Sequence, residues 1–297
     1  MGIKTVRTLF LAGVACLAGC GSKGQPPAGA AGKLSVVASF YPMYITTVNV
    51  AKDVPGVSVV NMTPSTTGCL HDYAITTADM KRLAAADVFV TNGAGMESFL
   101  DNVAGQYPRL KIVQLAQGIP LIKGHGAEGD NPHVWVSVSH AITQVKNLGK
   151  AMAEFDPPHG DLYRKNADAY AARLETLQAK MEAELAPYRG RKIVTFHEAF
   201  PYFAQEFGLE IAAVIEREPG SAPSARELAE TIDLVKESGV KALFSEPQYS
   251  GVAADAIARE TGAKVYVLDP GVTGPDDPDA YITIMEKNLA VLKEALQ

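Results

Sequence analysis

The stretch DLYRKNADAYAARLETLQAKMEAELAP, residues 161–187, decides the fold class. It contains no glycine, its one proline is its last residue, and its apolar residues recur close to every 3.6 positions, which predicts a single long helix. At 1.5 Å per residue such a helix reaches about 40 Å, enough to run along two lobes. We interpret it as a rigid connector that would limit hinge opening. The apolar positions are Leu162, Tyr170, Leu174, Leu177, Met181 and Leu185.

On both sides of this stretch, short β-branched runs alternate with helical patterns. Before it, the patterns predict strands at 34–40, 57–62, 88–92 and 111–116 and helices at 43–54, 76–87 and 95–105, with a Thr76 and Asp79 capping signature. After it, they predict strands at 192–196, 210–216, 241–245 and 264–269 and helices at 200–208, from Ser224, at 252–262 and from Asp279. The alternation predicts an α/β fold: two βα lobes with mostly parallel sheets, joined by a single long connector helix.

The N-terminus has the pattern of a targeting segment. Lys4 and Arg7 precede an apolar run that is too short to span a bilayer as a mature helix, which predicts a signal peptide. The sequence Leu-Ala-Gly-Cys at 17–20 resembles the lipobox of bacterial lipoproteins, which implies that Cys20 is lipidated. An ordinary cleavage site with an incidental cysteine is the alternative. We expect a signal peptide with Cys20 over 1–20, a flexible tether at 21–32, an N-terminal lobe at 33–158, the connector at 159–188 and a C-terminal lobe at 189–297.

Composition and cysteine usage exclude several classes of protein. The 297 residues are 47% hydrophobic and 20% charged with a formal net charge of −6, which is typical of a globular protein and gives no basic surface for nucleic acid. Cys16 would leave with the signal peptide and Cys20 would carry lipid, so Cys69 has no intramolecular partner and a disulfide framework is excluded. We expect a monomer anchored by its lipid on the extracytoplasmic side of a membrane.

Three histidines follow predicted strands. His71 and His133 come after strands 57–62 and 111–116 with their loops, and His197 directly follows strand 192–196. Ligands of open α/β sheets bind outside the carboxyl ends of the strands. Two carboxylates occupy matching places in the second half, Glu246 and Asp269.

Together, three neutral imidazoles and one carboxylate would form a tetrahedral site suited to Zn²⁺. Taken singly, each residue has a structural alternative. A loop histidine such as His71 can be solvated or cap a helix, and a histidine at a strand end such as His197 can bond to backbone. Glu246 can lie in a solvated turn, and Asp269 begins an Asp-Pro-Gly turn.

Four longer motifs carry a resemblance to a known family. They are LHDYAITTADMKRLAAADVFVTNGAGMESFLD, NPHVWVS, GRKIVTFHEAFPYFAQEFGLE and FSEPQYSGVAADAIARETGAKVYVLDP. In order and over nearly the whole chain after the tether, they resemble the zinc- and manganese-binding solute-binding lipoproteins of bacterial metal ABC transporters, the cluster A-I family. The resemblance implies two α/β lobes joined by one long helix, with the metal in the cleft between them. It also implies that His71, His133, His197 and Asp269 are the metal ligands.

The third ligand bears on the choice of metal. The resemblance implies that a histidine at this position, here His197, goes with zinc, whereas members that bind manganese commonly have a carboxylate there. Replacing a hard oxygen by imidazole also favours zinc over manganese on chemical grounds. We therefore predict Zn²⁺, with Mn²⁺ or Fe²⁺ as alternatives, captured outside the membrane and delivered to an ABC permease.

The chain departs from the family pattern at two places. The long His-rich loop of zinc-specific relatives is reduced to KGHGAEGDNPH, in which His125 and Glu128 are either a remnant of a metal-gathering loop or part of a solvated turn. Leu70 replaces a proline that many relatives have, and it follows Cys69. A thiolate would be a soft, zinc-favouring ligand, although the histidine-rich site is filled without it.

Further groups lie close to the predicted ligands in sequence. Glu246, Cys69 and Asp72 are kept as candidates for an additional ligand or for a group that positions one, and Tyr73, Trp135 and Glu198 also flank the ligands. His140 and His159 are expected to be surface or helix-capping residues.

Three other functions remain as alternatives. A zinc hydrolase needs an open coordination position, but HEAFP at 197–201 lacks the second histidine of an H-E-x-x-H motif and four protein ligands would close the site. We therefore expect a carrier and no enzyme. The second alternative is binding of a chelated metal or an organic molecule. The third is a metal-stabilised adhesion lipoprotein.

Overall fold

The computed structural model describes residues 1–2, 33–71, 73–124, 129–215, 224–248 and 251–297. The chain divides into two units, Met1–Gly32 and Lys33–Gln297, and the structure described below is that of the second. Most of the predicted signal peptide, together with Cys20, the tether, Asp72, His125 and Glu128, lies outside the described residues.

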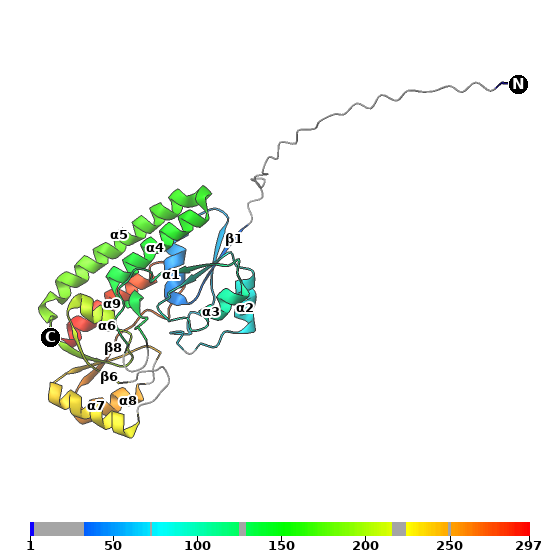
Figure 1. Ribbon diagram of the computed structural model, residues 1–297. Coiled ribbons are helices and arrows are strands. Elements are labelled where there is room, and N and C mark those ends of the chain that lie inside the picture. The colour runs from blue at the N-terminus through cyan, green and yellow to red at the C-terminus, as the bar shows by residue number, and fades with distance from the viewer. Residues whose placement is uncertain (3–32, 72, 125–128, 216–223, 249–250) are drawn as a thin grey trace. The chain divides into compact units, whose positions relative to one another are not determined.

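The N-terminal sheet has four parallel strands in the order β2-β1-β3-β4. Helix α1 lies on the side of the sheet that faces α4 and α5, and α2 and α3 lie on the other side (Figure 1). The strands are β1 (Leu34–Ala38), β2 (Val57–Asn61), β3 (Val88–Thr91) and β4 (Lys111–Gln114), and the helices are α1 (Tyr41–Val50), α2 (Thr77–Ala84) and α3 (Leu100–Gln106).

The C-terminal sheet repeats this arrangement in the order β6-β5-β7-β8, again fully parallel. In each sheet the strand order reverses next to the first strand, between β1 and β3 and between β5 and β7, which is where ligands of such sheets bind. The strands are β5 (Lys192–Thr195), β6 (Glu210–Val214), β7 (Ala242–Ser245) and β8 (Lys264–Val267), and the helices are α6 (Pro201–Phe207), α7 (Ala225–Ser238), α8 (Val252–Thr261) and α9 (Ala280–Ala295).

The connector is α5 (Gly160–Leu185), which packs along α4 (Val138–Phe155), α1 and α9 (Figure 1). Five of its six predicted apolar positions are buried, but Leu162 in the first turn is 38% exposed. The buried side chains of α5 join one hydrophobic core that includes residues of both lobes. The predicted fold, two parallel βα lobes joined by a long helix, is therefore confirmed.

A second connection between the lobes was not predicted. The segment between β8 and α9 returns to α1, where Pro275 accepts a hydrogen bond from Tyr41 Oη and Pro278 accepts one from Asn49 Nδ2, both at 2.8 Å. Tyr44 Oη also donates to Asp276 Oδ1 at 2.8 Å. The lobes are thus tied by α5 on one side and by this return segment on the other.

Local sequence signals explain where the helices begin. The Thr76 and Asp79 capping box at the start of α2 is present as predicted. Helix α3 begins five residues later than the pattern indicated. Gly93, Ala94 and Gly95 all have positive φ values of 52 to 87°, so a helix cannot begin at residue 95.

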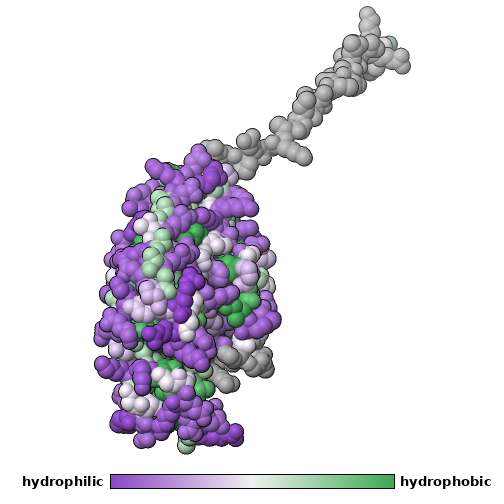
Figure 2. All heavy atoms as spheres, turned by 90° about the vertical axis from the view of Figure 1, so that its left-hand side faces the viewer, coloured by the Kyte–Doolittle hydropathy of each residue, from purple (hydrophilic) through white to green (hydrophobic). Residues whose placement is uncertain are grey.

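Figure 2 shows a face dominated by hydrophilic residues, with apolar residues in small separate groups. Among the described residues, the helices are all too short or too polar to cross a bilayer.

Candidate metal centre

Four potential ligands converge between the carboxyl ends of the two sheets. Cys69, His71, His133 and His197 each offer one ligand atom, and all four atoms lie within 4.8 Å of one another. His133 Nε2 is 3.0 Å from His71 Nε2 and 3.0 Å from His197 Nε2. In a tetrahedral zinc site with Zn–N bonds of about 2.0–2.1 Å, the nitrogens are about 3.3 Å apart. The histidines are therefore spaced nearly as a zinc ion requires.

Asn131 sets the orientation of His133. Its side-chain oxygen accepts the backbone N–H of His133 at 2.9 Å and lies 3.0 Å from His133 Nδ1. Because an amide oxygen only accepts, Nδ1 must carry the proton, and Nε2 presents its lone pair to the other two imidazoles. Asn131 Nδ2 donates to the carbonyl of Glu198, next to His197, at 2.9 Å. One amide side chain thus links the loops of two predicted ligands.

The loop that carries His133 is fixed from β3. Asn92, directly after that strand, donates from Nδ2 to the carbonyl of Pro132 at 2.9 Å, and its side-chain oxygen accepts from Gln144 at 2.9 Å. The backbone N–H of Asn92 in turn donates to the buried carboxylate of Glu97 at 2.8 Å. Sequence reasoning missed Asn92, Glu97 and Asn131. The histidines were selected because they follow the carboxyl ends of strands. Asn92 also follows a strand, so the same criterion would have selected it if amide side chains that hold a ligand loop had been included.

Burial favours the neutral form of His133. His133 and His197 are 1% and 2% exposed, and His71 is partly buried. Burial, followed by the proximity of His197 and His71, lowers the pKa of His133 well below its usual 6.5. Because imidazole must be neutral to ligate a metal, the group is ready to bind a cation at neutral pH. The donor set fits a divalent transition metal of the zinc type.

The two predicted carboxylates lie at the ends of β7 and β8, as expected, but neither belongs to the four-residue cluster. Asp269 Oδ1 accepts the backbone N–H of Gly271 at 2.8 Å, as in an Asp-Pro-Gly turn. Burial raises the pKa of Asp269, while this hydrogen bond and Lys287 oppose the rise.

Glu246 is more deeply buried, at 2% exposure. One oxygen accepts from Gln248 Nε2 at 2.6 Å, and the carboxylate also accepts the backbone N–H of His197. Its Oε1 atom is buried without a hydrogen-bond partner among the described residues. Burial raises the pKa of Glu246 well above its usual value.

The remaining described histidines lie outside the centre. His159 Nδ1 is 2.8 Å from Asp156 Oδ2 at the start of α5, in keeping with the expected structural role. His140 does not cap α4, because Ser137 is the capping residue. His140 is half-buried with its ring edge against Tyr202, and burial lowers its pKa. The expectation of a surface or capping His140 was therefore wrong, because α4 turns its first residues toward α6.

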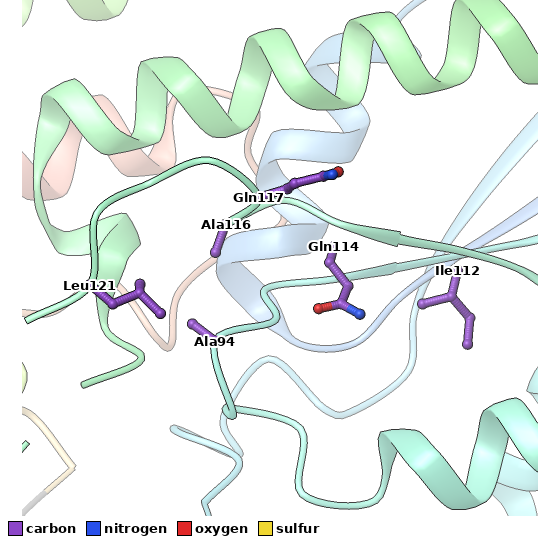
Figure 3. Close-up of a pocket in the computed structure, with 6 residues that line it drawn as sticks. All are labelled: Ala94, Ile112, Gln114, Ala116, Gln117 and Leu121. Atoms are coloured by element: carbon purple, nitrogen blue, oxygen red, sulfur yellow. The ribbon is translucent and has the colours of Figure 1, made fainter. Parts of the chain in front are cut away.

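A separate pocket of about 410 Å³ lies beside β4 (Figure 3). Among the described residues, its lining contains two glutamine amides and apolar side chains but no titratable group. The lining residues are Ala94, Ile112, Gln114, Ala116, Gln117 and Leu121.

Fold and site together define a class of protein. Two doubly wound lobes on a long connecting helix bring imidazoles from both lobes, His71 and His133 from one and His197 from the other, to one buried point. That arrangement is a two-lobed binding protein with a site for a divalent metal. The chain belongs to the ZnuA family, described as "Zinc-uptake complex component A periplasmic", whose model matches residues 36–295.

Known proteins of similar sequence agree with this assignment. The chain is 31% identical to the "High-affinity zinc uptake system protein ZnuA" of Bacillus subtilis, over 99% of this chain and 97% of that protein. It is 30% identical to the "Zinc-binding lipoprotein AdcA" of Streptococcus pneumoniae over 89% of this chain, and it spans 56% of that longer protein.

Solved structures share the fold. The solute-binding protein FpvC of Pseudomonas aeruginosa, in complex with Ni²⁺, superposes with a TM-score of 0.80 at 32% identity. The match covers 89% of this chain and 97% of FpvC.

Proposed function

We propose that this protein captures a divalent transition metal, foremost Zn²⁺, outside the cytoplasm and delivers it to a membrane ABC permease for uptake. The observation that carries the proposal is the convergence of three imidazoles from both lobes, with Nε2 atoms of His71 and His197 each 3.0 Å from that of His133. Membership of a family of zinc-uptake components supports the transport role.

Zinc is favoured by the donor set. Imidazole is a better ligand for zinc than for manganese, and manganese stands lowest in the Irving–Williams order. The ZnuA and AdcA relatives carry zinc in their names, while FpvC was solved with Ni²⁺. Mn²⁺ and Fe²⁺ are the alternatives for this chain.

Capture and release follow from the division of the ligands between lobes. His71 and His133 are carried by the N-terminal lobe and His197 by the C-terminal lobe. A small separation of the lobes on docking to a permease would lengthen the bond to one side and release the ion. With a fourth protein ligand beside the three histidines, no coordination position would stay open for a water nucleophile, and we infer a carrier without catalytic turnover.

The cellular setting is part of the same proposal. A signal peptide ending before Cys20, lipid on Cys20 and a tether over 21–32 would hold a monomer at the outer face of a membrane. The proposed lobes are residues 33–158 and 189–297, with the connector at 159–188. Asp269, predicted as the carboxylate ligand, stays a prediction.

Competition titration against a chromophoric chelator tests the function. We expect the wild-type protein to bind one zinc ion and to bind manganese more weakly. His71→Ala, His133→Ala and His197→Ala should each lower zinc affinity by at least about 100-fold, since each removes a ligand, which costs more than loss of a group that merely supports one. His159→Ala, whose partner is Asp156, is the matched control and should bind as wild type. Tighter binding of manganese than of zinc would contradict the metal assignment.

A further inference from the structure

The cluster contains a sulfur atom that the family resemblance does not account for. Cys69 Sγ lies within 4.8 Å of a ligand nitrogen of each of the three histidines. In a tetrahedral zinc site with a Zn–S bond of about 2.3 Å, sulfur and nitrogen are about 3.6 Å apart. The thiol therefore has to move relative to each nitrogen by no more than about 1.2 Å to share an ion with them.

The backbone around Cys69 holds it in place. Gly68 precedes it with φ of +85°, a left-handed conformation that glycine adopts readily. Leu70 follows it with a fully buried side chain, and the Leu70 backbone N–H points to Met96 Sδ at 3.4 Å. The residue between Cys69 and His71 is thus anchored in the core, which keeps both side chains near the same point.

A second observation at this place indicates a cation. Glu246 is 2% exposed, and its Oε1 atom is buried without a hydrogen-bond partner among the described residues. The same carboxylate accepts the backbone N–H of His197, so it adjoins the cluster, and its negative charge raises the pKa of the Cys69 thiol. A buried carboxylate oxygen with no donor is costly unless the group is protonated or a positive charge, such as a metal ion, lies nearby.

The thiol is better placed than the predicted carboxylate. Asp269 does not belong to the cluster, and its Oδ1 atom already accepts the backbone N–H of Gly271 at 2.8 Å. Three nitrogens and one sulfur lie within 4.8 Å of one another in the folded chain, and no Asp269 oxygen is among these atoms.

We propose that Cys69 is a metal ligand, so that the ion is held by three imidazoles and one thiolate. This inference rests on the proposed function, because it assigns the fourth ligand of the same site. On binding, the Cys69 S–H bond breaks, the sulfur keeps the electron pair and donates it to the metal, and the proton leaves to solvent. A thiolate strengthens the preference for zinc over manganese, because soft ligands suit zinc and hard oxygen ligands suit manganese.

Cobalt substitution of the full chain tests the assignment, since Co²⁺ bound to a thiolate gives an intense sulfur-to-metal charge-transfer band in the near ultraviolet. We expect this band in the wild-type protein and in Asp269→Asn, and we expect its loss in Cys69→Ser, which keeps the three histidines and still binds cobalt. In the processed protein Cys16 would be removed with the signal peptide and the Cys20 sulfur would carry lipid, so Cys69 would supply the free thiol in the wild type and in Asp269→Asn. Zinc affinity should fall by more than about tenfold in Cys69→Ser, the smaller of the losses typical of a weakened metal site.

The possible outcomes distinguish a failure of the Cys69 assignment from a failure of the proposed metal-carrier function. Cobalt bound by the wild type without the charge-transfer band, or a band that persists in Cys69→Ser, would overturn the thiolate ligand and leave the metal-carrier role intact. No metal bound by the wild type would overturn both. Alkylation of Cys69 in the wild type, located by peptide mass, needs no variant: bound zinc should slow it strongly, and an unchanged rate speaks against ligation.

Discussion

At the scale of single residues, Asn131 has the greatest influence among the groups that do not bind metal themselves. It receives the Nδ1 proton of His133 and donates to the backbone beside His197. One amide therefore orients the ring of His133, a predicted ligand, and holds the backbone next to His197, a predicted ligand from the other lobe.

Replacing Asn131 tests this dependence. We expect Asn131→Ala to lower zinc affinity by about 10- to 100-fold, the usual loss when a group that orients a metal-bound histidine is removed. Asn131→Asp keeps the acceptor for His133 and should lose less. Asn166→Ala is the matched control, because its amide likewise donates to two backbone carbonyls, those of Val50 and Lys52, but on α5. Chelator competition measures all three, and equal losses in Asn131→Ala and Asn166→Ala would refute the positioning role.

The protonation of His133 predicts how acid acts on the metal-free protein. Its pKa is lowered in the folded state, chiefly by burial, so the unfolded chain binds more protons between pH 6.5 and the folded-state pKa. The contribution of neutral His133 to the free energy of unfolding should therefore be fully present above pH 6.5. It should decline as the pH falls from 6.5 to the folded-state pKa. Urea unfolding of the apo protein at several pH values measures the decline, and His133→Gln should flatten it. A profile of equal slope in both proteins would contradict the assignment.

Single residues also show how far the sequence predicts the site. His71, His133 and His197 were found because the carboxyl ends of parallel strands meet at one edge, a rule that needs no coordinates. The nearness of Cys69 to them could not be predicted in this way. It depends on the left-handed Gly68 and on the anchoring of Leu70 by Met96, which are properties of the loop path. The support from Asn131 depends likewise on a contact between the lobes.

At the scale of elements, the close approach of α4 and α5 is a tight constraint on sequence. A Cβ atom added to Gly149 in α4 would lie 2.5 Å from Ala167 Cβ in α5, which is far inside contact distance. Gly105 in α3 is exposed and has open space around it. A side chain at position 149 would therefore disturb the packing of α4 on α5, whereas a side chain at position 105 would disturb no packing.

Alanine at these two positions separates packing from helix propensity. Gly149→Ala should destabilise the protein by about 1–3 kcal/mol, the usual cost of overpacking. Gly105→Ala should be neutral or stabilise it by up to about 1 kcal/mol, because alanine is the better helix former. Chemical unfolding measures both, and a loss of stability in Gly105→Ala as large as that in Gly149→Ala would show that the α4–α5 contact is not the cause.

The capping box of α2 gives a second test at this scale. Burial by itself would raise the pKa of Asp79, but hydrogen bonds from Thr76 and Tyr73 and the charge of Arg82 lower it below 3.8. The stability from Asp79 is therefore present above pH 3.8 and is lost as the pH falls through the lower folded-state value. Asp79→Asn should remove that part of the acid sensitivity, and Asp101→Asn on the exposed side of α3 should not. Thermal unfolding between pH 5 and pH 2.5 checks the difference.

The elements themselves were predicted largely from hydrophobic period and capping residues. The strands and the connector agree with the pattern because buried parallel strands and a long amphipathic helix both have strong periodic signals. The hydrophobic period could not predict where α3 begins. Three successive residues before the helix have left-handed backbone conformations, and one of them, Ala94, is not a glycine.

At the scale of the whole described unit, two connections oppose wide opening of the lobes. One is α5, and the other is the return segment whose Pro275 and Pro278 carbonyls accept from Tyr41 and Asn49 of α1. Trp135 and Tyr281 add a third contact, because Tyr281 Oη donates to the Trp135 carbonyl at 2.8 Å. Motion between metal-free and metal-bound states should therefore be small.

Zinc addition tests this stiffness. We expect zinc at 100 times its dissociation constant to stabilise the folded state by about 2.7 kcal/mol, and removal by a chelator to reverse the gain. The radius of gyration from solution scattering should stay nearly constant, because α5 and the return segment both tie the lobes together. A large contraction on zinc binding would contradict this restraint.

Trp135 gives this protein a built-in optical reporter. It is the single tryptophan of the chain, its ring centroid lies 5.3 Å from that of His133, and its indole N–H donates to the Pro270 carbonyl, one residue beyond Asp269. All tryptophan emission therefore comes from a ring that touches a predicted ligand of one lobe and the loop of the other. Loading and unloading of the ion can thus be followed by intrinsic fluorescence in real time, without a label, including during release to a permease.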